Sequence, residues 1–237
     1  MLTEQQLKEF SVKFQTSLIN VVREYVQNLF LHYFYSFKES EAFLFKGGTA
    51  LRILYRSPRF SEDLDFSCKQ IIKEKIEDLI QETIIKISME GIEVDVKESK
   101  ETTGGFLAII AVKLLSHDFE IFFEASSRKK KSTGQLVLVE NPFIDSYTVM
   151  SLKREELINE KIGALLQRMK PRDFFDLYFM LRANLLPDKI VLKKVLPIIE
   201  KSKINFKSEL SQFLPQSYQR LIKDFKNTLI SELKRFV

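Results

Sequence analysis

The stretch from Lys46 to Phe66 contains two chemical motifs separated by one short helix, and it constrains the fold more than any other part of the chain. Its first motif is the turn Lys46-Gly47-Gly48-Thr49, whose paired glycines permit backbone conformations that other residues resist. A glycine turn that opens a helix presents free N–H groups and the positive end of the helix dipole, which together favour bound phosphate. We therefore predict a phosphate site at this turn, with Lys46 and Arg52 as nearby cations. The alternative is a turn that only caps a buried helix.

The second motif is Asp63-Leu64-Asp65-Phe66. On a strand, this order points both carboxylates to one face and both apolar side chains to the other. Adjacent carboxylates repel each other unless a cation lies between them, and hard oxygen ligands suit Mg²⁺. Asp63 and Asp65 are therefore the predicted metal ligands. Taken alone, the motif also fits the exposed face of an edge strand.

Together the two motifs resemble a known signature. A Gly-Gly-Thr turn, a short helix and Asp-x-Asp on a strand are typical of the polymerase-β-like nucleotidyltransferase superfamily. The longer string GGTALRILY…RFSEDLDFS is similar to the AbiEii/AbiGii-type toxin nucleotidyltransferases, the enzymatic half of type IV toxin–antitoxin pairs. A second block, Glu155–Leu181, resembles the C-terminal motif of that family. Each motif alone is weak support, but their shared order and spacing are specific.

The resemblance implies a chemistry for the first block. In the superfamily, the two aspartates hold metal ions that bridge the triphosphate and the attacking hydroxyl, so that both the incoming and the leaving oxygen are stabilised. Gly47 and Gly48 would hold the β- and γ-phosphates through backbone N–H groups, and Thr49 through its hydroxyl. The implied cofactor is Mg²⁺ and the implied substrate is a nucleoside triphosphate. The implied partners are an RNA acceptor, such as a tRNA end, and an antitoxin protein.

A third carboxylate usually completes such a site from a neighbouring strand, where it binds a metal or takes a proton. Asp118–Ala125 is predicted to be a strand that places Glu120, Phe122 and Glu124 on one face. Glu124 is the preferred third carboxylate, because IFFEASSR resembles the strand of the family that ends in an acid and an arginine. Glu120 is its rival.

The second block carries charges at helical spacing. Lys161, Leu165 and Arg168 share one helix face, and Asp173 and Asp176 are neighbours on the next helix. By spacing alone, these charges fit a solvated helix face. The resemblance implies instead that Lys161 and Asp176 belong to the active site. Weaker candidates in the block are Arg168, Arg172 and Asp173.

Composition limits the other possibilities. The chain has 237 residues, of which 45% are hydrophobic, so it can bury a sizeable core. Its single cysteine, Cys68, excludes an internal disulfide and fits a reducing cytoplasm. The net charge of +5 permits a nucleic-acid partner without requiring one. The basic run Arg128–Lys131 is either an RNA contact or a solvated loop. The apolar run Leu18–Phe37 contains charged residues, so we expect a cytoplasmic protein with no membrane span.

The predicted fold is α+β (α/β), with a polymerase-β-like nucleotidyltransferase core. Residues 1–150 would form this core, a mixed sheet flanked by helices, and residues 151–237 a helical domain that completes the active site. Helices are predicted over Thr3–Phe37, with one break, and over Gln70–Met89. Strands are predicted over Ile92–Glu98, Phe106–Leu115, Asp118–Ala125 and Gln135–Val139, and helices from about Ser151 to the end.

We therefore expect a Mg²⁺-dependent nucleotidyltransferase that acts on RNA as the toxin of a type IV pair. One alternative is a phosphohydrolase that uses Asp63 and Asp65 as a nucleophile pair, but such enzymes need a strongly apolar strand before the first aspartate. The other alternative is a catalytically silent protein of the same fold that only binds a partner or nucleic acid.

Overall fold

The computed structural model describes residues 1–127, 132–185, 189–202 and 204–237. Its contacts divide the chain into two compact units. Unit 1 consists of Met1–Arg56 and Phe60–Lys153, and unit 2 of Ser57–Arg59 and Arg154–Val237. The basic run Arg128–Lys131 lies outside the described residues.

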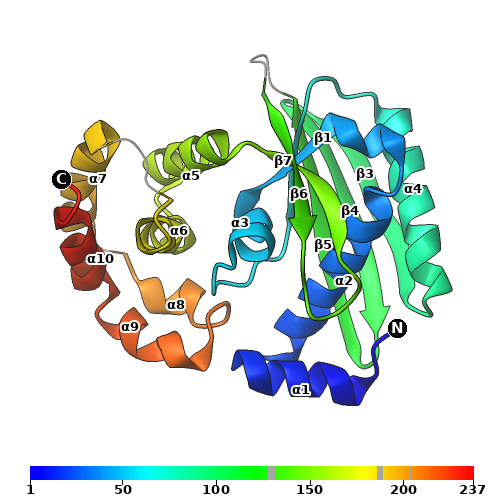
Figure 1. Ribbon diagram of the computed structural model, residues 1–237, viewed down its shortest axis with the longest axis horizontal. Helices are drawn as coiled ribbons and strands as arrows, with labels where there is room; N and C mark the ends of the chain where they lie inside the picture. Colours follow the sequence, from blue (N-terminus) through cyan, green and yellow to red (C-terminus); the bar gives the residue numbers. More distant parts are fainter. Residues whose placement is uncertain (128–131, 186–188, 203) are drawn as a thin grey trace. The chain divides into compact units, whose positions relative to one another are not determined.

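Unit 1 is built on a seven-stranded sheet with the strand order β3-β4-β5-β2-β1-β7-β6 (Figure 1). The strands are β1 (Phe43–Lys46), β2 (Leu64–Cys68), β3 (Glu93–Thr102), β4 (Gly105–Leu114), β5 (His117–Ser127), β6 (Gly134–Val139) and β7 (Tyr147–Leu152). Two pairs, β2 with β5 and β1 with β7, are parallel, and the other neighbours are antiparallel. The predicted mixed α+β fold is confirmed.

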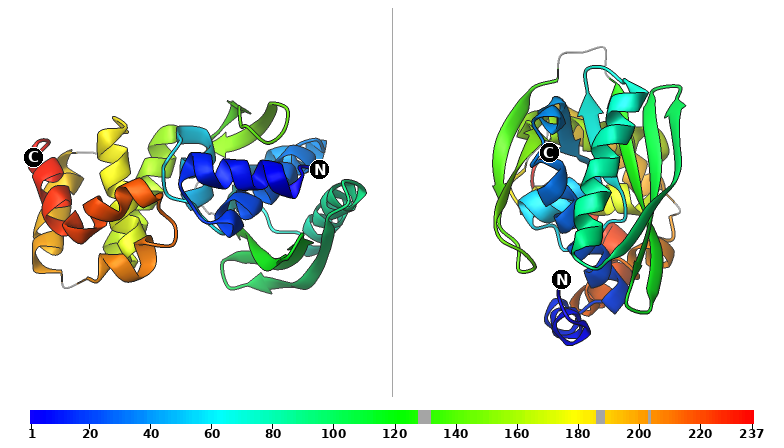
Figure 2. Two further views of the ribbon diagram at one scale, coloured as in Figure 1. Left: turned by 90° about the horizontal axis from the view of Figure 1, so that it is seen from below. Right: turned by 90° about the vertical axis from the view of Figure 1, so that its right-hand side faces the viewer.

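Helices pack against this sheet. Those of unit 1 are α1 (Glu4–Phe14), α2 (Leu18–Phe34), the short 3-10 helix η1 (Lys38–Ala42), α3 (Gly47–Tyr55) and α4 (Lys73–Met89). The expected break in the N-terminal helix falls at Gln15, whose φ of 54° ends α1 in the left-handed region. Helices α2 and α4 lie side by side on the sheet (Figures 1 and 2).

Phenyl rings fill the core between α2 and the central strands. Phe66 of β2 and Phe123 of β5 stack with their ring centres 4.7 Å apart, and Phe34 of α2 contacts both rings. All three side chains are fully buried. Burying a Phe side chain contributes about 1.5–3 kcal/mol, and an aromatic pair adds about 0.5–1.5 kcal/mol. This packing fixes β2 beside β5 and so determines which side chains meet on the opposite face of the sheet.

In the described part of unit 2, the regular elements are helices. Its helices are α5 (Arg154–Arg168), α6 (Pro171–Arg182), α7 (Lys189–Lys201), α8 (Phe206–Leu210), the 3-10 helix η2 (Gln216–Tyr218), α9 (Gln219–Lys223) and α10 (Phe225–Lys234). Its core is again aromatic, with Phe225 stacked on Phe175 and in edge contact with Phe206.

The structure differs from the sequence prediction at two strands. Neither β1 nor β7 was expected as a strand, and Ser151 and Leu152, expected to be helical, end β7. In β7 the buried Tyr147, Val149 and Ser151 alternate with more exposed residues, which is the pattern of a strand. Pairing with β1 on one side and β6 on the other overrides the helical pattern that begins at Arg154.

Candidate active site

Two charged side chains of the first block and one of β5 meet in one pocket of unit 1. Asp65 on β2 lies opposite Lys46 on β1 and opposite Glu124 on β5. Directly opposed residues on neighbouring strands point to the same face, with their Cβ atoms about 5 Å apart. All three line a pocket of about 310 Å³, which the hairpin turn between β3 and β4 also borders at Gly104 and Gly105. The structure therefore brings Lys46, Asp65 and Glu124 together.

Gly47 lies directly against the Asp65 carboxylate. A Cβ atom built on Gly47 would come within 1.9 Å of Asp65 Oδ2, and the glycine φ is +82°. Only glycine adopts this backbone conformation readily and leaves room for the carboxylate. Because Gly47 opens α3, the carboxylate and the free N–H groups of the helix start lie in one place. The alternative of a simple capping turn does not account for this contact.

Lys46 is held by a neighbour that the sequence did not suggest. Its ammonium group donates a hydrogen bond to Ser126 Oγ at 2.7 Å, and Ser126 Oγ donates in turn to the carbonyl of Phe66 at 3.2 Å. Lys46 is buried, with 8% of its surface exposed. This arrangement holds one positive charge on the same sheet face as the two carboxylates. The strand pairing of β5 supplies Ser126, so spacing along the chain gave no signal for it.

Asp63 and Thr49 are linked at the entry to β2. Thr49 is fully buried, and its hydroxyl donates a hydrogen bond to the carbonyl oxygen of Asp63. The Thr49 hydroxyl hydrogen is thereby used inside the protein, so a phosphate would meet this residue through its backbone N–H. Asp63 is the residue just before β2 begins. Strand β2 lies between β1 and β5, so the alternative of an edge strand is wrong.

Glu124, and not its rival Glu120, shares the pocket with Asp65. Glu120 forms an ion pair with Lys97 at 2.6 Å and lies opposite Ala111 on β4, away from β2. The parallel register of β2 and β5 sets this difference, because it places Glu124 and not Glu120 opposite Asp65.

Arg52 is engaged on another side of α3. Its guanidinium group donates to both carboxylate oxygens of Glu24 on α2, at 3.0–3.2 Å, and stacks over the ring of Phe60. Burial raises the pKa of Glu24, and the Arg52 charge opposes that rise. Arg52 lines a different pocket from the one that contains Asp65. In this structure it ties α3 to α2.

In unit 2, a buried ion cluster joins Lys161 to Asp176. The Lys161 ammonium donates to Asp176 Oδ2 at 2.8 Å, and Arg59 donates to both carboxylate oxygens at 2.8 and 3.0 Å. Asp176 is 1% exposed and Arg59 is 4% exposed. Although burial alone would raise the pKa of Asp176, the charges of Arg59 and Lys161 lower it to about 2. The alternative of a solvated charge face is therefore wrong for Lys161 and Asp176.

Arg59 was missed by sequence reasoning. Arg59 lies within the first block, four residues before Asp63, and a basic residue so close to the acidic motif was a possible indication of a role. Its partner Asp176 is more than a hundred residues away in the chain, so the sequence gave no indication of their ion pair. The weaker candidates of the second block take other partners. Arg168 holds Asp173 through both carboxylate oxygens, Asp173 also accepts from the backbone N–H of Lys170, and Arg172 lies 3.5 Å from Glu209. The Asp173 contacts fasten the start of α6.

The pocket at Asp65 has the chemistry of a cation site that shares its ligands with a substrate. Among the described residues, no group of three or more His, Cys, Asp or Glu side chains could hold a metal ion. Magnesium usually keeps one or two protein carboxylates and takes its other ligands from water and substrate phosphates. Asp65 and Glu124 supply such a carboxylate pair, and the start of α3 offers a phosphate position beside it. These residues therefore fit Mg²⁺ bound together with a triphosphate.

Comparison with known proteins gives one matching family and similar solved structures. The sequence pattern of the family described as "Nucleotidyl transferase AbiEii toxin, Type IV TA system" matches residues 30–235. The crystal structure of JHP933 from Helicobacter pylori is similar to this chain, with 20% sequence identity and a TM-score of 0.65, and the match covers 93% of each of the two chains. A protein described as "putative nucleotidyltransferase from H. pylori" is 19% identical with a TM-score of 0.67, and the match covers 93% of this chain and 95% of that one. At these identities the two structures show a shared fold. The curated proteins gave no match.

Within the described part of the chain, no helix has both the length and the apolar character needed to cross a membrane.

A first prediction concerns the contact between Gly47 and Asp65. Gly47→Ala should lower the free energy of unfolding by about 1–3 kcal/mol, because alanine is strained at this φ. It should lower nucleotide transfer on the order of 10²-fold, since a displacement of about 1 Å at a reacting centre has that effect. The control is Gly163→Ala on α5, where an added Cβ meets no atom within 4 Å. Urea unfolding and transfer assays on both variants check this, and equal behaviour of the two would contradict it.

A second prediction concerns the pH dependence of the Asp176 cluster. The pKa of about 2 in the folded protein is below the ordinary value of 3.8, so ionised Asp176 stabilises the fold above that value. Asp176→Asn should lower the free energy of unfolding by about 3–5 kcal/mol at pH 7, because it leaves buried cations without their partner. The difference from wild type should shrink between about pH 4 and pH 2, as the wild-type carboxylate gains its proton.

Urea unfolding at pH 7, 5, 4 and 3 measures this difference. Glu155→Gln, an exposed change on α5, is the control and should alter stability by no more than about 0.5 kcal/mol. A difference below about 1 kcal/mol at pH 7 would show that the cluster does not stabilise unit 2.

Proposed function

The chain belongs to the AbiEii family of nucleotidyl transferase toxins of type IV toxin–antitoxin systems, and from this premise we propose a specific reaction. The protein would transfer a nucleotide from a nucleoside triphosphate to a hydroxyl group of RNA, such as a tRNA end, in a Mg²⁺-dependent step. The observation that carries this proposal is the meeting of Asp65, Glu124 and the start of α3 at Gly47.

In this proposal, the free backbone N–H groups at Gly47 and Gly48 bind the β- and γ-phosphates. Lys46 supplies positive charge from the neighbouring strand. Asp65 and Glu124 would hold Mg²⁺, which would supply positive charge to the triphosphate and to the attacking oxygen, and Asp63 lies just before the same strand. These roles are supported by the shared pocket of Lys46, Asp65 and Glu124.

The reaction exchanges one phosphorus–oxygen bond for another and moves one proton. The acceptor hydroxyl oxygen bonds to the α-phosphorus, while the bond from that phosphorus to the oxygen bridging to the β-phosphate breaks. Pyrophosphate leaves, and the proton of the hydroxyl passes to Glu124 or to water. A carboxylate placed beside the attacking group can take this proton without further rearrangement.

Lys161 and Asp176 have different roles in this proposal. A lysine ammonium has three N–H donors, of which the bond to Asp176 uses one, so Lys161 retains donors for a phosphate. Asp176 binds two cations and has a pKa of about 2, which makes it a poor proton acceptor near neutral pH. We assign it as a positioning residue that fixes the ammonium of Lys161.

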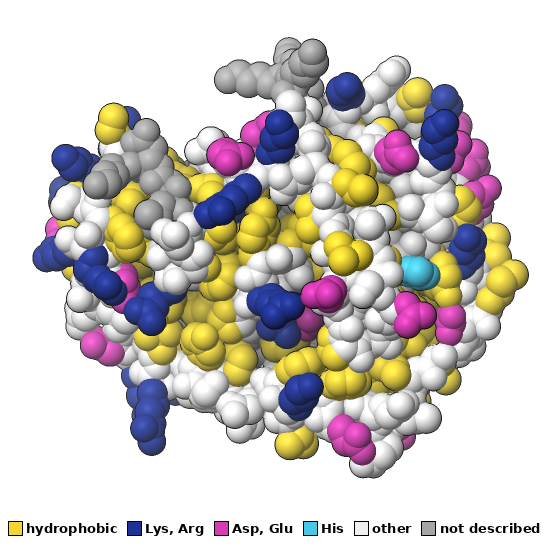
Figure 3. All heavy atoms as spheres, viewed as in Figure 1, with side chains coloured by type: hydrophobic (Ala, Val, Ile, Leu, Met, Phe, Trp, Pro, Cys, Tyr) yellow, Lys and Arg dark blue, Asp and Glu magenta, His cyan; other side chains and the backbone are white. Residues whose placement is uncertain are grey.

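The RNA acceptor is supported by the distribution of charge. Unit 2 contains 18 Lys and Arg against 10 Asp and Glu, a formal charge of +8, which leaves −3 for unit 1. Figure 3 shows basic side chains spread over this face of unit 2. A strongly basic unit attracts the phosphates of nucleic acid. An antitoxin partner and a cytoplasmic location are proposed from the family alone.

The two alternatives are less well supported. The phosphohydrolase reading requires an apolar strand leading into the first aspartate, whereas β2 begins after Asp63. A silent protein of this fold would have no need for the contact between Gly47 and the Asp65 carboxylate, which limits position 47 to glycine. Activity measurements separate these readings.

A third prediction compares two glutamates of the same strand. Glu124→Gln should lower nucleotide transfer by about 10²–10⁴-fold, the range for loss of a positioned acid–base group. Glu120→Gln removes the same charge from β5 but only breaks an exposed ion pair, so transfer should stay within about twofold of wild type. The assay incubates each protein with each radiolabelled triphosphate, Mg²⁺ and total RNA, and follows label in RNA.

Asp65→Asn serves as the inactive reference. Absence of transfer by the wild-type protein with all four triphosphates would support the silent alternative. Equal rates for the two glutamine variants would remove Glu124 from the proposed site.

A further inference from the structure

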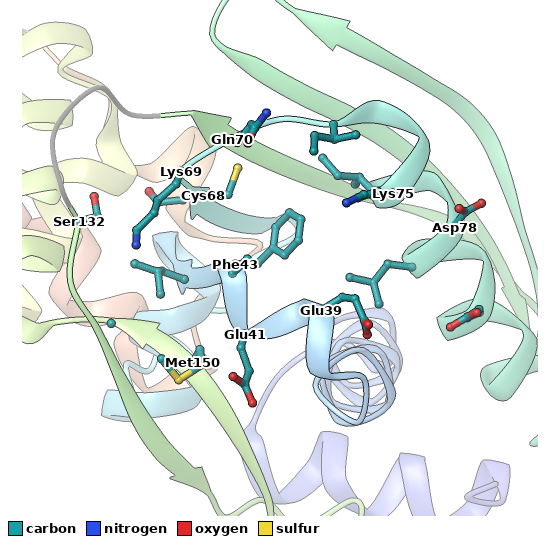
Figure 4. Close-up of a pocket in the computed structure, with 18 residues that line it drawn as sticks. Glu39, Glu41, Phe43, Cys68, Lys69, Gln70, Lys75, Asp78, Ser132 and Met150 are labelled. Carbon is teal, nitrogen blue, oxygen red and sulfur yellow. The ribbon is translucent and has the colours of Figure 1, made fainter.

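A second pocket of unit 1, of about 920 Å³, lies where β1 begins and β2 ends (Figure 4). Figure 4 shows Phe43 of β1 at its centre, with Lys69 and Gln70 entering from the segment after β2 and Lys75 from α4. Resting on the function proposed above, we propose that this pocket binds the unpaired terminal nucleoside of the acceptor RNA.

Apolar side chains on both sides of β1 line the pocket. Leu44 is buried on the same strand face as Ser67, and Phe43, Ile76 and Leu79 are buried on the face covered by α2 and α4. A pocket of this size and character suits a compact ligand with flat apolar surfaces and a few polar edges. A nucleobase has this chemistry, since its faces stack on apolar side chains and its edges form hydrogen bonds.

The side chain of Ser67 is a buried polar group in this pocket. Ser67 is 1% exposed, lines the pocket, and its hydroxyl has no hydrogen-bond partner among the described residues. A buried polar atom without a partner costs about 1–3 kcal/mol, so such atoms are rare in folded proteins. A hydrogen-bonding ligand in the pocket would satisfy the Ser67 hydroxyl.

The charged side chains of the lining favour a nucleoside over a triphosphate as the ligand of this pocket. Among the described residues of the lining, the ammonium groups of Lys69 and Lys75 stand against the carboxylates of Glu39, Glu41, Asp78 and Glu82. Repulsion from the carboxylates disfavours a triphosphate. Carboxylates accept hydrogen bonds from ribose hydroxyls and base amino groups, and the lysines can neutralise one backbone phosphate. This combination favours a nucleoside at the end of a chain.

The position of the pocket assigns that nucleoside to the acceptor. Along β2, Ser67 follows Asp65 by two residues, so it lies on the same strand face about 6.6 Å further on. Its partner Leu44 precedes Lys46 by two residues, and Gly47 lies beyond Lys46 in the opposite direction. In an in-line displacement, the attacking oxygen and the leaving oxygen lie on opposite sides of the phosphorus. When pyrophosphate lies at Gly47, the acceptor hydroxyl therefore approaches the phosphorus from the side of Ser67.

The test uses an exposed position at the rim. Ala42→Trp places a large side chain at the rim and fills the pocket from outside. The matched control is Val12→Trp on α1, where the Val12 side chain is 78% exposed. Binding is measured with two 5′-labelled RNA hairpins, one with an unpaired 3′ overhang and one blunt. Wild type should bind the overhang hairpin more tightly than the blunt one. Ala42→Trp should weaken overhang binding at least tenfold and leave blunt binding unchanged, while Val12→Trp should match wild type.

Ser67→Ala provides a second readout that a structural role would not produce. Because the hydroxyl has no hydrogen-bond partner in the part of the chain that the structure describes, its removal should leave the melting temperature unchanged and weaken overhang binding severalfold. In transfer assays, both pocket variants should raise the KM for RNA and leave the KM for the triphosphate unchanged.

The inference is overturned if wild type binds both hairpins equally, or if Ala42→Trp binds the overhang as wild type does. Absence of transfer by wild type would count against the proposed reaction instead, since the binding comparison does not depend on turnover.

Discussion

The contact between Gly47 and the Asp65 carboxylate is the constraint on which the rest of this site depends. It joins the start of α3, where backbone N–H groups are free, to the strand that carries the acidic motif. The position of Asp65 is set in turn by β2, which lies between β1 and β5 and places Lys46 and Glu124 opposite it. Phenyl packing of Phe66 and Phe123 on the other face holds β2 and β5 in this register. A core built for stability thus determines which charges meet.

The second unit contributes a different kind of constraint. The segment Ser57–Arg59 belongs to unit 2, although the residues on both sides of it belong to unit 1. Within unit 2, Arg59 is held by Asp176, which also holds Lys161. This segment connects α3 to the approach to β2, so the chain between the two motifs of the first block is anchored by an ion pair of the second block. Loss of Asp176 would remove this shared carboxylate from both cations at once.

Much of this arrangement could be predicted from the sequence, because its signals are local. The alternation in Asp63–Phe66, the glycines after Lys46 and the helical spacing of the C-terminal block each reflect neighbours in the chain. The resemblance predicted the mixed sheet and the family, and both predictions are confirmed. What sequence reasoning missed depends on pairing between distant segments: the strands β1 and β7, the bond from Lys46 to Ser126, and Arg59 beside Asp176. The preference for Glu124 came from a resemblance, and the register of β5 supplies its physical reason. The roles of the site residues stay predictions.

We infer that Asp65 on β2 and Glu124 on β5, which lie beside the start of α3, bind a triphosphate through Mg²⁺. The most direct test is calorimetric titration of a nucleoside triphosphate analogue with a non-cleavable bond between the α- and β-phosphates. The analogue is titrated into wild-type protein with Mg²⁺, into wild-type protein with EDTA, and into the Asp65→Asn variant with Mg²⁺. We expect saturable one-site binding in the first experiment and loss of at least about 1.4 kcal/mol of binding free energy, a tenfold change in Kd, in the other two. Equal affinity in Mg²⁺ and EDTA would contradict it.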